Sequence, residues 1–80
     1  MDSPLFIVIE SMDAGRKGGH EVIVHGCFFD REKALLCMKN KAKESQEKYG
    51  ASLEEGLDWA NVIHGEVYFV FEIQESYISN

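Results

Sequence analysis

The chain has 80 residues, 45% of them hydrophobic, which is enough for one domain with a single core and argues against a disordered protein. Its two cysteines are too few for a disulfide-bonded scaffold, and its net charge of −6 argues against a general nucleic-acid binder. The first apolar run, Leu5–Ile9, is too short for a signal peptide or a membrane span. We therefore expect one cytoplasmic domain over residues 1–80, with reduced cysteines.

Two β-strands are predicted in the first third of the chain. Leu5–Ile9 is apolar on both faces of a strand, which places it near the centre of a sheet. A glycine-rich loop follows, and His20–Phe29 has the alternation of a second strand. Gly26 interrupts its apolar side chains and indicates a β-bulge or the close approach of another chain.

One long amphipathic helix is predicted from Arg31 to Tyr49. Asp30 is a preferred N-cap residue, and Gly50 is placed to end the helix as its left-handed C-cap. Residues three, four and seven apart form the apolar stripe that would face the sheet, namely Leu35, Met38, Ala42 and Tyr49, with Ala34 at its edge.

The segment after Gly50 has two interpretations. Ser52 and Glu55 match the capping box of a short helix over residues 53–60, although Gly56 disfavours it. The alternative is an irregular segment in which Trp59 fills the edge of the core, followed over residues 61–65 by a connector or a short strand.

The last strand is predicted over Glu66–Gln74, where the alternation is clearest, and residues 76–80 are expected to fray. The fold class is then α+β of ββαβ order, a three- or four-stranded antiparallel sheet with one long helix packed on one face. With the last strand beside the first, Leu5–Ile9 lies at the centre. One helix leaves the second sheet face uncovered, so we expect a homodimer.

The strand-to-helix joint Val24–Ala34, after a strand such as Phe6–Glu10, resembles small bacterial and phage domains of unassigned function. In those domains a strand ends in a glycine and an aromatic residue, and a capped helix follows. The resemblance covers the first half of the chain, implies the ββαβ arrangement, and carries no active-site residue with it.

Candidate interaction residues come from two observations. Leu36 and Cys37 point away from the helix stripe, and Trp59 lies in the uncertain segment, so these three could contact a partner. Residues 51–80 contain six acids and no base, whereas residues 1–50 contain all eight lysines and arginines. The acidic candidates for binding a basic partner protein are Glu54, Glu55 and Asp58.

A third set of residues could carry chemistry. His25 and Cys27 lie two residues apart on one strand and are predicted to share a face, which His64 or His20 could approach. Paired metal-ligand spacings do not recur in the sequence, so we expect no metal, no other cofactor and no catalytic residue.

Protein–protein association as a homodimer without catalysis is the function that these patterns favour. One alternative is an acidic inhibitor or adaptor, of phage type, that binds a basic partner protein. The other is a small ligand- or metal-binding enzyme that uses His25, Cys27 and His64.

Overall fold

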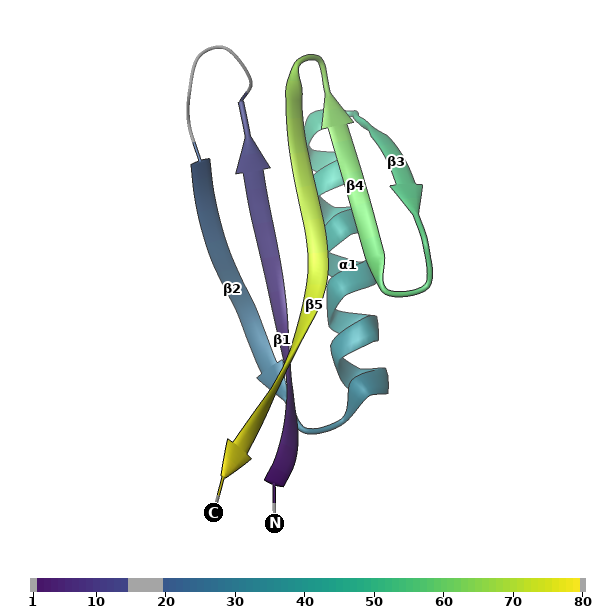
Figure 1. The fold of residues 1–80 in the computed structure, drawn as a ribbon. Helices are drawn as coiled ribbons and strands as arrows, with labels where there is room; N and C mark the ends of the chain where they lie inside the picture. Colours follow the sequence, from purple (N-terminus) through teal and green to yellow (C-terminus); the bar gives the residue numbers. More distant parts are fainter. Residues whose placement is uncertain (1, 15–19, 80) are drawn as a thin grey trace.

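The computed structural model describes residues 2–14 and 20–79, which form five strands and one helix. β1 (Asp2–Asp13) and β2 (His20–Phe28) precede α1 (Arg31–Tyr49), and β3 (Ser52–Glu55), β4 (Trp59–His64) and β5 (Val67–Ser79) follow it. The strands make one antiparallel sheet in the order β2-β1-β5-β4-β3, and α1 crosses one face of it (Figure 1).

The predicted ββαβ order with three or four strands is therefore wrong, because the segment after the helix folds as two strands. Ser52–Glu55 is a strand where the capping box predicted a helix, and it pairs with Trp59–His64. A helix of two turns has little stability of its own, so the ladder with β4 outweighs the local capping signal. Ala60 and Val62 are fully buried on one face of β4, so the short strand that remained open for residues 61–65 is observed over Trp59–His64. Trp59 does not fill the edge of the core, since it is 41% exposed.

The helix prediction is confirmed at both ends. Asp30 has an extended backbone, and its side chain accepts a hydrogen bond from the backbone N–H of Glu32 at 2.9 Å. Gly50 has a φ of 59°, the left-handed conformation that glycine adopts without steric cost, and its N–H bonds to the carbonyl of Gln46. The two caps satisfy free backbone groups and fix the helix at the length predicted.

The two terminal strands form the centre of the sheet. β1 pairs with β5 along its whole length, from Asp2 opposite Ser79 to Asp13 opposite Tyr68, so the expectation that residues 76–79 fray is wrong. Leu5–Ile9 is central, as its two apolar faces predicted. Both chain ends lie at the same end of the molecule (Figure 1).

The core lies between α1 and one face of the sheet. The helix contributes Ala34, Met38 and Ala42, all with 0% exposure, and the two alanines let the backbone approach the sheet closely. The sheet contributes large side chains from the three middle strands, namely Phe6, Val8, Val62, Phe69 and Phe71. The helix stripe is thus centred on Ala34, Met38 and Ala42, whereas Tyr49 is 38% exposed at its end.

Candidate functional site

The sheet face opposite α1 is called the open face here, because none of the described elements covers it (Figure 1). Residues that pair directly across antiparallel strands point to the same face, so the register defines its members. Its apolar side chains come from all four long strands: Ile7 and Ile9 of β1, Val22, Val24 and Cys27 of β2, Trp59 and Ile63 of β4, and Tyr68 and Val70 of β5.

Four of these side chains are strongly exposed: Val22 at 67%, Val24 at 58%, Tyr68 at 47% and Trp59 at 41%. Together they leave on the order of 350–400 Å² of apolar surface in water. These four side chains are spread over β2, β4 and β5, with Ile9 and Val70 among the residues between them in the ladder, and exposed apolar surface of this extent is commonly a binding surface.

The charges on the sheet are all of one sign. The five strands contain no lysine or arginine, and six of the eight basic residues are on α1, on the other side of the sheet. On the open face Glu72 lies between Ile9 and Trp59 in the ladder, and Glu54 pairs with Asn61 near the edge. The open face of the described strands therefore carries acidic side chains and no lysine or arginine, while Glu10, Glu21, Glu55 and Glu75 lie on the sheet face towards the lysine-rich helix.

Trp59 is held in place on the open face by the turn before it. The N–H of Gly56 donates to the carbonyl of Trp59 at 2.9 Å and closes the β3–β4 hairpin. A Cβ atom on Gly56 would overlap the indole ring of Trp59, so only glycine leaves room for the ring there. The turn thereby fixes the largest aromatic side chain of this surface.

The other candidate interaction residues lie in different places. Leu36 is 62% exposed on the outer side of α1, whereas Cys37 is half-buried and packs against the core. Glu55 is exposed on the helix side of β3, since it pairs with the buried Ala60. Asp58 lies in the β3–β4 turn, 3.7 Å from Arg31, a surface pair that contributes little stability. Of the six candidates, only Trp59 and Glu54 are on the open face.

A β-bulge in β2 places His25 under the helix. Val8 pairs with Gly26 and Ile9 pairs with Val24, so His25 is an extra residue in β2. The bulge that Gly26 indicated is thus confirmed, and it turns the His25 ring towards α1.

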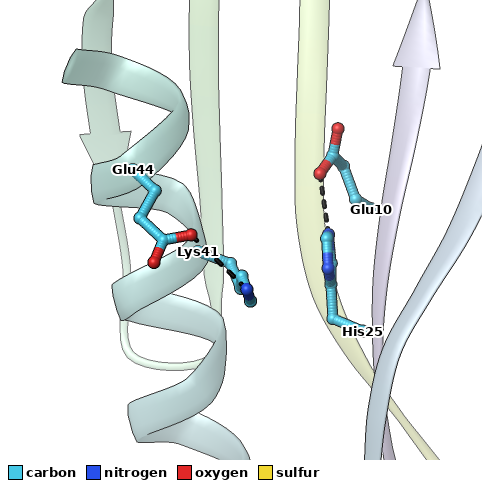
Figure 2. A network of polar contacts seen from close by, with 4 residues as sticks. All are labelled: Glu10, His25, Lys41 and Glu44. Atoms are coloured by element: carbon cyan, nitrogen blue, oxygen red, sulfur yellow. Dashed lines mark hydrogen bonds and ion pairs between the residues drawn. The ribbon is translucent and has the colours of Figure 1, made fainter. Parts of the chain in front are cut away.

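Beneath the helix, His25 is paired and packed. Its Nε2 atom lies 2.7 Å from Oε1 of Glu10 (Figure 2). Its ring stacks on Phe71 with 6.1 Å between the centroids. The side chains of His25 and Glu10 are only 17% and 15% exposed. Glu10 was not predicted from the sequence as a partner of His25.

The bulge separates the residues of the third alternative. Cys27 pairs with Ile7 and lies on the open face, so the prediction that it shares a face with His25 is wrong. His64 lies near the end of α1, where its ring centroid is 5.6 Å from that of Tyr49. Among the described residues, no group of three histidine, cysteine or acidic side chains could hold a metal ion.

A pocket of about 170 Å³ opens between α1 and the β1–β2 side of the sheet, and is called the helix-side pocket here. Glu10 and His25 line it from the sheet, and the second half of the helix lines it with Lys41, Glu44, Ser45, Lys48 and Tyr49. Figure 2 shows the Lys41 side chain extending from the helix towards the sheet, with Glu44 bonded to it at 3.4 Å.

Comparisons with family models, with curated proteins and with solved structures return no match for this chain. The resemblance described for residues 24–34 therefore stays a prediction. In the part of the chain that the structure describes, no helix is long and apolar enough to cross a membrane.

Proposed function

We propose that the protein acts by protein–protein association, and that its open face is the interface of a homodimer. The observation that supports this proposal is a five-stranded sheet covered by one helix on one face, with exposed valine, tyrosine and tryptophan side chains on the other. An antiparallel sheet can leave one face in water, and that face is then polar. Here the uncovered face carries exposed apolar side chains, which a second copy of the chain would cover.

The size of the open face fits a dimer of moderate stability. Five strands spaced about 4.8 Å apart are roughly 19 Å across, and six to eight residues of the longer strands add about 20–26 Å. Two such faces would bury about 750–1,000 Å² in total, which reaches the lower limit for a specific interface. A dissociation constant in the micromolar range is therefore expected.

The acidic character of the open face favours a second candidate, a basic partner protein on the same surface. Glu72 lies near the middle of the face, and a two-fold dimer would bring two Glu72 carboxylates close together. A partner that carries lysine or arginine there would instead form opposite-charge pairs. The two candidates predict opposite responses to salt and to removal of this charge.

Sedimentation velocity of matched variants tests the homodimer. Val24→Glu places a charge on the open face, whereas Leu36→Glu places the same charge on the outer side of α1 at nearly the same exposure. We expect Val24→Glu to be monomeric at concentrations where Leu36→Glu and the unmodified protein are dimers. Equal dimerisation of all three would refute the open face as the interface.

Glu72→Gln separates the two candidates. It should tighten a homodimer on the order of fivefold, because it removes a like-charge contact, and higher salt should do the same. If Glu72→Gln and high salt each weaken binding of the chain to a basic protein, the result would support the basic partner. Glu55→Gln is the control, since it makes the same charge change away from the open face.

A further inference from the structure

The helix-side pocket is independent of the open face, because it lies on the opposite side of the sheet. Its floor is the Glu10–His25 pair, which is nearly buried against Phe71. A largely buried polar pair of this kind is seldom more stabilising than apolar side chains of the same size. Placing this pair there also required an extra residue in β2, and bulges of this kind commonly re-aim a side chain next to a binding or active site.

The charged side chains that line the pocket differ in how many partners they have. Glu10 accepts from His25, and Glu44 is engaged by Lys41 through a long contact of 3.4 Å. Lys48 lies with its Nζ 5.2 Å from the centre of the Tyr49 ring, and in the described part of the chain it has no carboxylate partner. Among the described residues, each pocket carboxylate has one side-chain partner and keeps further lone pairs, while Lys48 has no carboxylate partner and Lys41 keeps donor hydrogens beyond its one long contact.

The available donors lie along one side of the helix. Lys41, Ser45 and Lys48 are spaced by four and three residues, so they share a face and line the same pocket. Tyr49 lies at the C-terminal end of α1, where its ring stacks on the Phe69 ring with 5.2 Å between the centroids. Two ammonium groups beside a hydroxyl are the donor set that binds a carboxylate or phosphate group.

We propose that the helix-side pocket binds a small anion with a carboxylate or phosphate group. Lys41 and Lys48 would hold its oxygens, Ser45 would donate a further hydrogen bond, and the Glu10–His25 pair would form the floor. A volume of about 170 Å³ fits a small molecule of few heavy atoms. Dissociation constants in the millimolar range are expected, because few atoms make contact.

The test is a titration followed by 1H–15N NMR at neutral pH. Inorganic phosphate and acetate are added in separate arms up to tens of millimolar, and sodium chloride at matched ionic strength is the reference. Saturable shifts confined to residues near 10, 25 and 41–49 are expected in at least one arm. The arm that saturates at lower concentration identifies phosphate or carboxylate as the preferred group.

Three lysine variants decide whether the helix-side pocket causes the anion-dependent NMR shifts. Lys41→Gln and Lys48→Gln should each weaken binding about tenfold, as expected for loss of a charged hydrogen bond. Lys43→Gln makes the same charge change at an exposed helix position outside the pocket lining and should alter binding less than about twofold. Shifts no different from those with chloride, or equal weakening by all three variants, would overturn the proposal.

Discussion

The packing of Met38 offers a direct check of which side of α1 faces the sheet. Met38 has 0% exposure at the centre of the core, whereas Leu36, two residues earlier, is 62% exposed. Truncating a buried methionine to alanine costs about 2–5 kcal/mol, partly because a cavity remains. Truncating an exposed leucine in a helix changes stability by less than about 0.5 kcal/mol.

For a chain of this size, the difference between the stability losses of Met38→Ala and Leu36→Ala is large. An 80-residue domain is stable by about 4–12 kcal/mol, so a loss near 3 kcal/mol removes a substantial part of the total. The melting temperature of Met38→Ala should fall by about 12–24 °C, since each kcal/mol shifts it by about 4–8 °C. Leu36→Ala should melt within about 4 °C of the unmodified protein.

The assay is thermal and urea unfolding followed by far-ultraviolet circular dichroism. All samples must have the same protein concentration, because association stabilises the folded state by mass action. Equal losses in the two variants, or a larger loss for Leu36→Ala, would show that α1 packs through another side. The assignment of the open face would then fail as well.

Three further predictions concern local contacts. Asp30→Ala should lower stability by about 1 kcal/mol in urea unfolding, because it removes the N-cap hydrogen bond, and no measurable loss would contradict that role. Gly56→Ala should displace the Trp59 ring and shift its fluorescence emission, while an unchanged spectrum would show that the turn leaves the ring free. The hydrogen bond from the Tyr77 hydroxyl to Glu75, with the charge of that carboxylate, raises the pKa of Tyr77 above 10.0. In an NMR titration Glu75→Gln should bring this pKa down, and the same pKa in both proteins would refute the contact.

The features that could be predicted from the sequence are those set by local chemistry. Asp30 and Gly50 are cap residues whose preferences come from their own side chain or its absence, so they mark both helix ends correctly. The two apolar faces of Leu5–Ile9 also correctly predict a strand near the centre, since β1 lies beside the middle strand β5. These signals need no knowledge of which strands pair.

The features that were missed depend on pairing between distant segments. Ser52–Glu55 matches a capping box in the sequence, and only its ladder with β4 makes it a strand. The extra residue at His25 shifts the alternation of β2, so two positions that period-two counting puts on one face lie on opposite faces. Glu10 becomes a partner of His25 only through that shift.

The central claim is that the open face associates with a second copy of the chain, and the mass of the unmodified protein in solution tests it most directly. Sedimentation equilibrium from low to high micromolar concentration should show the mass rising from 9.1 kDa towards twice that value. A mass of 9.1 kDa over the whole range would contradict the homodimer.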